Sequence, residues 1–245
     1  MATTTSSFMF LKLSTSFPCH TRTGSLRSSK LIKAQSSDVQ KEHVVIVGGG
    51  IAGLATALSL HRLGVRSLVL EQSDSLRTGG TSLTLFKNGW SVLDSIGVAN
   101  HLRTQYLEIQ GQEVRAVERR VLLETLAAQL PPDTIQYSSR LVKIEPSSNG
   151  DTLLEFTNGS KLLAQIVIGC DGIRSPIAKW MGFSEPKFVG HCAFRGLASY
   201  SDGQPFQPRV NYIYGKGLRA GYVPVSPTKV YWFICFNSSS PGPYL

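Results

Sequence analysis

Three glycines and one glutamate in this chain are spaced as in a site that holds a phosphorylated ligand. Gly48, Gly50 and Gly53 form the pattern G-x-G-x-x-G, and Glu71 follows them along the chain. In such a pattern the first glycine permits a tight turn, the second lets the backbone approach a pyrophosphate, and the third lets a helix pack closely on a strand. A carboxylate at Glu71 can accept hydrogen bonds from ribose hydroxyls, so the spacing favours a dinucleotide with a free 2′-hydroxyl.

A strand, a helix and a second strand are needed to position these residues, and the sequence predicts all three. Residues 44–47 are apolar and β-branched, which is typical of a buried parallel strand. Residues 51–62 have helical spacing of apolar side chains, and Gly64 stands where a helix C-terminal glycine belongs. A second strand is predicted at residues 67–70, directly before Glu71. Since a helix N-terminus offers free N–H groups to phosphates, the residues expected to bind the ligand are Gly48, Gly50, Ile51, Ala52, Gly53 and Glu71.

Two later segments place polar residues where a ligand could bind. Residues 117–131 carry leucines at helical spacing, with Arg119 near the start of the predicted helix. Residues 162–182 contain an apolar strand that runs into Asp171 and Gly172, and a further helical segment follows. Open α/β sheets bind ligands at the carboxyl ends of their strands, so this second strand end is another candidate binding position.

The chain resembles the class A flavoprotein monooxygenases, the family of p-hydroxybenzoate hydroxylase, in the segments VGGGIAGL, LEQSDSLRTGG, ERRVLLETL and GCDGIRS. The resemblance runs from about His43 to the end of the chain. It implies a Rossmann-like domain that binds FAD, in which Asp171 and Gly172 support the use of both FAD and NAD(P)H. It also implies that Arg119 and Arg77 lie on the FAD side of the site.

The resemblance implies an enzyme that uses NAD(P)H and O₂ to hydroxylate a small organic substrate, an aromatic one in many members of the family. The flavin would carry the redox chemistry, while the protein would bind, orient and exclude water. The sequence shows no Ser/His/Asp or Cys/His pattern for a nucleophile, and no CxxC pair, so no metal site is predicted. Two alternatives stay open: a non-catalytic fragment of such an enzyme, and a plastid flavoprotein that acts on isoprenoids.

The residues after Gly182 predict an antiparallel sheet, because short alternating or apolar runs are separated by turn residues. The resemblance implies that this β-rich part is a substrate domain lying over the flavin. Arg219 and Tyr231 match a substrate-side arginine and tyrosine of FAD-dependent urate hydroxylase, and they are the candidate catalytic residues. A buried guanidinium in this place could hold an anionic oxygen of the substrate.

The expected fold is α/β, with a Rossmann-like FAD/NAD(P)-binding domain at residues 41–184. Residues 185–245 are expected to begin a substrate domain built on a mixed or antiparallel sheet. Members of the family carry a third FAD motif, G-D-A-A-H-x-x-x-P, which has no match before Leu245. The resemblance therefore implies a fold that is incomplete at its C-terminus.

Residues 1–37 have the composition of a disordered transit peptide. They are rich in serine and threonine and contain five basic residues and no acid, which favours the chloroplast over the mitochondrion as the destination. The formal net charge of the chain is +9, and this segment holds five of those charges, so the basic balance does not indicate nucleic-acid binding. The sequence contains no run of about 18 apolar residues, so no transmembrane helix is predicted. The expected partner is a small-molecule substrate, and the oligomeric state is left open.

Overall fold

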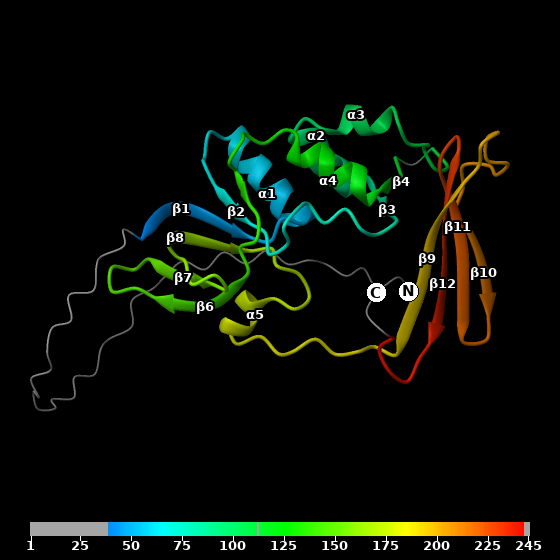
Figure 1. The fold of residues 1–245 in the computed structure, drawn as a ribbon. Coiled ribbons are helices and arrows are strands. Elements are labelled where there is room, and N and C mark those ends of the chain that lie inside the picture. Colours follow the sequence, from blue (N-terminus) through cyan, green and yellow to red (C-terminus); the bar gives the residue numbers. More distant parts are fainter. Residues whose placement is uncertain (1–38, 112, 243–245) are drawn as a thin grey trace, which may run out of the picture.

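An α/β part with a six-stranded sheet and a separate four-stranded sheet make up the two ends of the molecule (Figure 1). The structure is a computed structural model that describes residues 39–111 and 113–242, so the predicted transit peptide lies outside the described residues. The larger sheet has the strand order β5-β2-β1-β8-β7-β6. Its strands are β1 (Gln40–Val47), β2 (Leu68–Leu70), β5 (Ile135–Gln136), β6 (Leu141–Pro146), β7 (Thr152–Phe156) and β8 (Lys161–Gly169).

The centre of this sheet is parallel. Strand β1 pairs in parallel with β2 on one side and with β8 on the other, and Val47 lies level with Leu70 and Gly169. Alternate residues of β1 pack into two different cores, one on each face of the sheet. Burial on both faces explains why the strand is an uninterrupted apolar run. The predicted α/β fold is confirmed, and the carboxyl ends of three strands meet at one edge.

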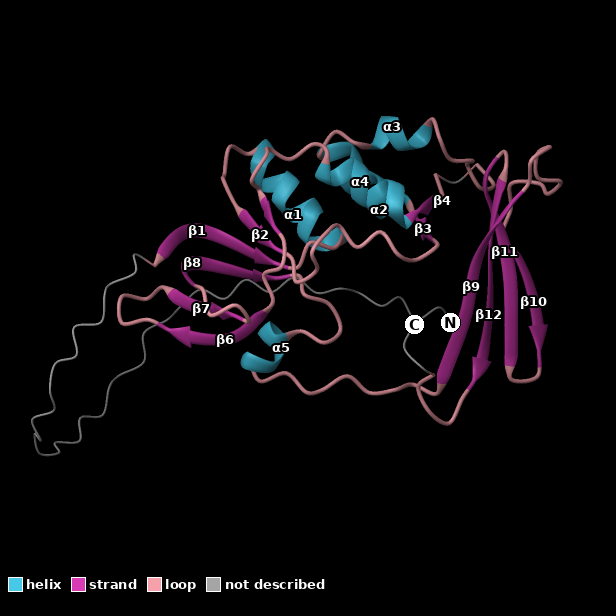
Figure 2. Ribbon diagram, viewed as in Figure 1, coloured by secondary structure: helices cyan, strands magenta, loops and turns pink. Residues whose placement is uncertain are grey.

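Helices lie on both sides of the six-stranded sheet (Figure 2). Helix α1 (Ile51–Arg62) lies on one side, together with α2 (Lys87–Ser95), α3 (Ala99–Arg103) and α4 (Arg119–Ala127), and the short α5 (Pro176–Trp180) lies on the other. Leucines of α1 and α4 share one core with the fully buried Trp90 of α2. A small antiparallel pair, β3 (Ser82–Leu85) and β4 (Arg115–Glu118), leads directly into α4.

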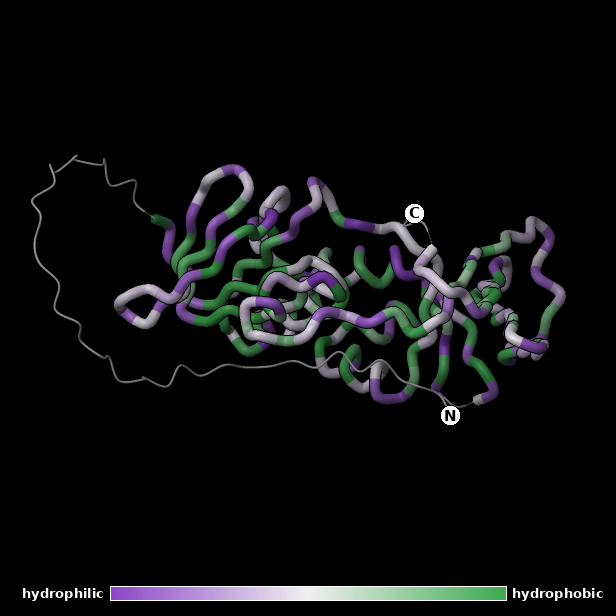
Figure 3. Tube along the Cα trace, turned by 90° about the horizontal axis from the view of Figure 1, so that it is seen from below, coloured by the Kyte–Doolittle hydropathy of each residue, from purple (hydrophilic) through white to green (hydrophobic). Residues whose placement is uncertain are grey.

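The four-stranded sheet is antiparallel throughout, as the sequence predicts. Its order is β10-β11-β12-β9, formed by β9 (His191–Ser199), β10 (Asn211–Gly215), β11 (Leu218–Ser226) and β12 (Lys229–Asn237). Hydrophobic residues follow the strands and helices, whereas the connecting loops are largely polar (Figure 3). A long connection without regular structure joins α5 to β9 (Figure 1).

One face of this sheet, here called the inner face, packs at one end against the α/β part. Val223, Val225 and Tyr231 belong to the same core as Trp90, and the amide of Leu107 donates to the carbonyl of Val225 at 3.0 Å. The strand pairing places on this face Arg195, Leu197, Tyr212, Tyr214, Arg219, Val223, Lys229, Tyr231 and Phe233. Within residues 39–111 and 113–242, no helix has both the length and the apolar content required to cross a bilayer.

Candidate functional site

The glycine loop between β1 and α1 is held by close backbone contacts. Gly48 has a φ of +110°, and a Cβ built on it would lie 2.3 Å from the carbonyl oxygen of Cys170. A Cβ on Gly53 would lie 1.9 Å from the carbonyl oxygen of Gly48. Neither position can accept a side chain without moving backbone, so both glycines are required for the shape of the loop.

Gly50 differs from these two glycines because the space beside it is open. A Cβ on Gly50 would meet nothing within 4 Å, and its φ of −81° is one that any residue adopts. Gly50 is also the N-cap of α1, which has no side-chain hydrogen bond capping its first turn. The first amides of the helix therefore remain available to an anion, supported by the helix dipole. These free amides and the open space beside Gly50, together called the cradle, fit the pyrophosphate of a dinucleotide.

Glu71 directly follows β2 and contacts the glycine loop with its carboxylate. Its side chain is buried, and its Oε2 accepts the amide hydrogen of Gly49 at 2.7 Å. Its Oε1 accepts from the amide of Ser73 at 3.0 Å. A carboxylate can accept more than two hydrogen bonds, so Glu71 can orient the glycine loop and still receive a ribose hydroxyl.

Arg119, the first residue of α4, reaches the segment that follows β2. Its Nη1 donates to the carbonyls of Arg77 and Gly79 at 2.6 and 2.7 Å. Burial lowers the pKa of Arg119, the charge of Arg77 lowers it further, and the charge of Glu71 opposes both. The charges of Arg77 and Glu71 thus both act on Arg119, and Arg119 organises the loop that carries Arg77. The side chain of Arg77 itself is exposed.

Asp171 and Gly172 follow β8 and lie beside the glycine loop. The amide nitrogen of Asp171 would be 2.9 Å from a Cβ on Gly48, and the amide of Cys170 donates to the carbonyl of Val47 at 2.7 Å. Asp171 Oδ2 accepts from the amide of Ile177 at 3.1 Å, which ties it to the start of α5. Gly172 has a φ of +83° and open space around it. The structure therefore places the backbone of Asp171 beside the glycine loop, with its carboxylate bonded to the start of α5 and an unobstructed Gly172 after it.

The neighbouring thiol of Cys170 is a packing group rather than a nucleophile. Its pKa is raised by burial and by the charge of Asp171, while a hydrogen bond with Thr56 acts in the opposite direction. A raised pKa keeps the thiol protonated near neutral pH. The site at the edge of β1, β2 and β8 is thus suited to binding and orientation, without a reactive side chain of its own.

The two candidate catalytic residues on the four-stranded sheet share the inner face but are not adjacent. Arg219 pairs with Cys235, whereas Tyr231 pairs with Val223 and Leu197. Their positions differ by four residues along β12, or about 13 Å at the usual rise per residue. Tyr231 is buried in the core shared with the α/β part, and Arg219 is exposed.

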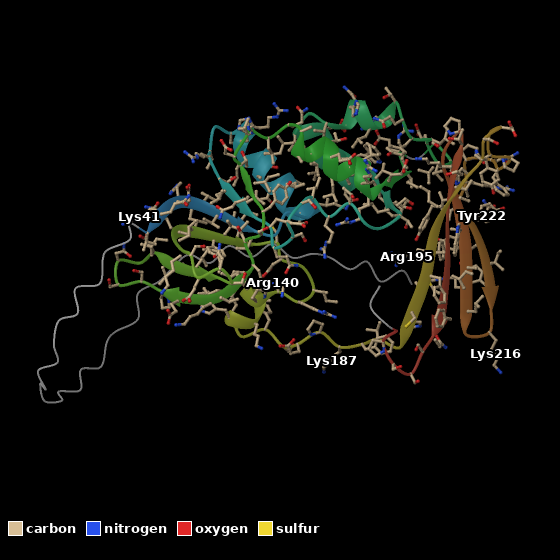
Figure 4. All side chains as sticks on the ribbon, in the orientation of Figure 1. Lys41, Arg140, Lys187, Arg195, Lys216 and Tyr222 are labelled. Atoms are coloured by element: carbon tan, nitrogen blue, oxygen red, sulfur yellow. The ribbon has the colours of Figure 1, made fainter. Side chains whose placement is uncertain are left out.

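Arg195 is a candidate that sequence reasoning missed. It pairs with Phe233, one step along the inner face from Tyr231, and its charge acts on the pKa of Tyr231. Burial raises that pKa, Arg195 lowers it, and Cys235 raises it. Neither Arg195 nor Arg219 has a hydrogen-bond or ion-pair partner among the described residues. Figure 4 labels Arg195 on β9, between the α/β part and the rest of its sheet. Residues 191–199 show no regular alternation of polar and apolar side chains, so only the strand register reveals Arg195.

Comparisons with known proteins agree with this geometry. A family model described as an FAD binding domain matches residues 41–143. Monooxygenase 2 from Arabidopsis thaliana is 37% identical over 218 residues, which cover 80% of this chain and 53% of that protein. 3-Hydroxybenzoate 6-hydroxylase from Klebsiella oxytoca is 30% identical over 196 residues, which cover 68% of this chain and 49% of that protein.

Solved structures share the fold. The crystal structure of HpxO from Klebsiella pneumoniae, complexed with FAD and uric acid, superposes with a TM-score of 0.70 at 19% identity, covering 84% of this chain and 58% of that one. The tetrameric form of 2-methyl-3-hydroxypyridine-5-carboxylic acid oxygenase gives 0.70 at 20% identity, covering 84% and 61%. The chain spans about half the length of the curated relatives it matches. The family model and the similarity to the Arabidopsis monooxygenases show that this chain carries an FAD-binding domain and is related to FAD-dependent monooxygenases.

Proposed function

We propose that this chain binds FAD at the carboxyl edge of β1, β2 and β8 and serves in a monooxygenase that uses NAD(P)H and O₂ to hydroxylate a small organic substrate. The observation that carries the proposal is the open cradle at Gly50, flanked by Glu71, Arg119 and Asp171. When bound, FAD supplies the redox chemistry, which no side chain of this edge provides.

Each part of the cradle has a separate binding role in this proposal. The amides at the start of α1 hold the pyrophosphate, because they are uncapped and carry the positive end of the helix dipole. Glu71 receives the ribose hydroxyls with the lone pairs that Gly49 and Ser73 leave free. Arg119 holds the loop after β2 in place, and Asp171 holds the segment after β8.

The residues on the inner face of the four-stranded sheet favour, as the substrate, an aromatic molecule that carries a negative charge. Its aromatic rings form a connected strip: Tyr231 stacks on Phe233 at 6.0 Å, Phe233 contacts Tyr212 edge-on at 6.0 Å, and Tyr212 stacks on Tyr214 at 5.9 Å. Arg195, opposite Phe233, and Arg219, opposite Tyr214, border this strip. Aromatic rings and guanidinium groups bind a planar anion through stacking and paired hydrogen bonds. The Klebsiella oxytoca relative, 3-hydroxybenzoate 6-hydroxylase, is named for such a substrate.

The location of the protein is also proposed. A chloroplast destination rests on the composition of residues 1–37, which are rich in serine and threonine and free of acids. To test import, residues 1–37 are fused to a fluorescent protein and the fusion is imaged in leaf cells. Signal in mitochondria would favour the alternative destination.

The test of the function is a flavin-binding experiment followed by a turnover experiment. The full chain is mixed with FAD and freed of unbound flavin by gel filtration, and a retained two-banded flavin spectrum is expected. NADH and NADPH oxidation is then measured with aromatic acids under ¹⁸O₂, and incorporation of one labelled oxygen into the product is expected. A chain that retains FAD but never labels a product would support the non-catalytic alternative, and a colourless chain would contradict FAD binding by this chain.

A further inference from the structure

An ion pair joins the four-stranded sheet to the α/β part. Lys229, at the start of β12, places its Nζ 2.9 Å from both carboxylate oxygens of Glu118, at the end of β4. The Lys229 side chain is 37% exposed and that of Glu118 is 19% exposed. The two residues are far apart in the sequence, so this contact forms only when the sheet is docked. Because the pair is half-buried, its geometry is constrained more than that of an ordinary surface pair.

Glu118 is the residue that directly precedes Arg119. It ends β4, is the N-cap of α4, and lies opposite Ser82 in the small antiparallel pair. The amide of Arg119 donates to the carbonyl of Thr81 at 3.1 Å, while its guanidinium holds the carbonyls of Arg77 and Gly79. Two adjacent residues therefore carry the carboxylate of Glu118, which faces Lys229, and the guanidinium of Arg119, which organises the loop at residues 77–80.

The ion pair also determines which cation Glu118 attracts. The two residues that follow Glu118, Arg119 and Arg120, are both cations, and the charge of Glu118 already acts on Arg120. Arg120 is engaged by Glu124 at 2.7 Å. With Lys229 removed, a half-buried carboxylate would be left without its partner, and Arg119 is the adjacent cation that could neutralise it. Such a move would take the guanidinium away from the carbonyls of residues 77 and 79.

We propose that Lys229 is a positioning residue: its ion pair with Glu118 keeps Arg119 on the loop at residues 77–80, and so couples docking of the four-stranded sheet to the shape of the flavin site. This inference rests on the proposed FAD site for its functional consequence. The coupling means that the sheet expected to carry substrate and the loop expected to border the flavin are arranged together. A shift of one is transmitted to the other through Glu118 and Arg119.

The experiment compares Lys229→Met with Lys216→Met in the full chain. Lys216 lies in the exposed turn between β10 and β11 of the same sheet (Figure 4), so its substitution removes the same charge without touching Glu118. Hydrogen–deuterium exchange of the amides at residues 77–81 is measured without flavin, and the FAD dissociation constant is measured by flavin fluorescence. Lys229→Met is expected to speed exchange and to weaken FAD binding by about threefold or more, whereas Lys216→Met changes neither.

A double-mutant cycle separates positioning from simple docking. In an Arg119→Gln background, Lys229→Met should have no further effect on the FAD dissociation constant, because the residue it positions is absent. Lys229→Arg keeps the charge and should restore exchange toward the wild-type rate. If Lys229→Met lowers Tm but leaves both exchange at 77–81 and FAD binding unchanged, Lys229 only docks the sheet and the inference is overturned. If the wild-type chain binds no FAD while exchange still responds, the positioning role stands and the proposed FAD function of this chain fails.

Discussion

The carbonyl oxygen of Cys170 lies 2.3 Å from the place where a Cβ on Gly48 would be. This contact locks the turn after β1 to the segment after β8, and the amide of Cys170 strengthens it by donating to the carbonyl of Val47. The first glycine of the pattern is therefore required by the protein's own backbone. Asp171 follows Cys170, so the same contact brings its backbone amide to the glycine loop, while its carboxylate bonds to the start of α5.

Gly48→Ala is expected to destabilise the folded chain strongly. The added methyl group would overlap the backbone of Cys170 and Asp171, and the φ of +110° is unfavourable for any residue with a Cβ. Overlap with backbone together with strain costs about 3 kcal/mol or more in the free energy of unfolding. Urea unfolding followed by circular dichroism measures this value. A loss below about 1 kcal/mol would show that the two strand ends are not in close contact.

Gly50→Ala is expected to separate ligand binding from folding. The methyl group would meet nothing within 4 Å and the backbone φ is ordinary, so the free energy of unfolding should change by no more than about 1 kcal/mol. The same methyl group would occupy the cradle, so FAD binding should weaken on the order of tenfold. Both quantities are measured beside Gly48→Ala. Unchanged FAD affinity would place the pyrophosphate elsewhere.

The β-α-β unit could be predicted from the sequence because its signals are local. The apolar run before Gly48, the helical spacing from residue 51 to 62 and the position of Gly64 each depend on neighbours in the chain. The structure has β1, α1 and β2 in these places, and the antiparallel sheet after Gly182 is also present.

The bonds within the site could not be predicted in the same way. That Glu71 accepts from the amide of Gly49, or that Arg119 holds the carbonyls of residues 77 and 79, depends on how distant segments pack. Arg195 was missed because its importance follows from the strand register, which places it one step from Tyr231. Spacing identifies candidate residues, whereas their partners are set by tertiary structure. The binding roles of these residues stay predictions.

Glu71→Gln is expected to weaken both the fold and FAD binding. Each carboxylate oxygen of Glu71 accepts a backbone amide hydrogen, and a glutamine would turn its NH₂ group toward one of these donors. Losing one buried acceptor costs about 1–3 kcal/mol in the free energy of unfolding. Glu155→Gln is the matched control, because the partly exposed Glu155 pairs with the exposed Lys161 at 3.6 Å, and a change within about 0.5 kcal/mol is expected. Equal effects of the two substitutions on stability would contradict the role assigned to Glu71.

Tyr106→Phe is expected to reduce the loss of stability at alkaline pH. Burial, and then the charge of Glu118, raise the pKa of Tyr106 to about 12, whereas an unfolded tyrosine ionises near about 10. As pH rises between these values the unfolded state loses the proton first, so the free energy of unfolding falls. Tyr106 should account for about 1 kcal/mol of that fall at about pH 11, which Tyr106→Phe removes. Urea unfolding at about pH 8 and about pH 11 measures the difference, with the exposed Tyr214→Phe as the control that should behave as wild type. The same alkaline loss in all three proteins would mean that the Tyr106 phenol ionises as readily in the folded chain as in the unfolded one.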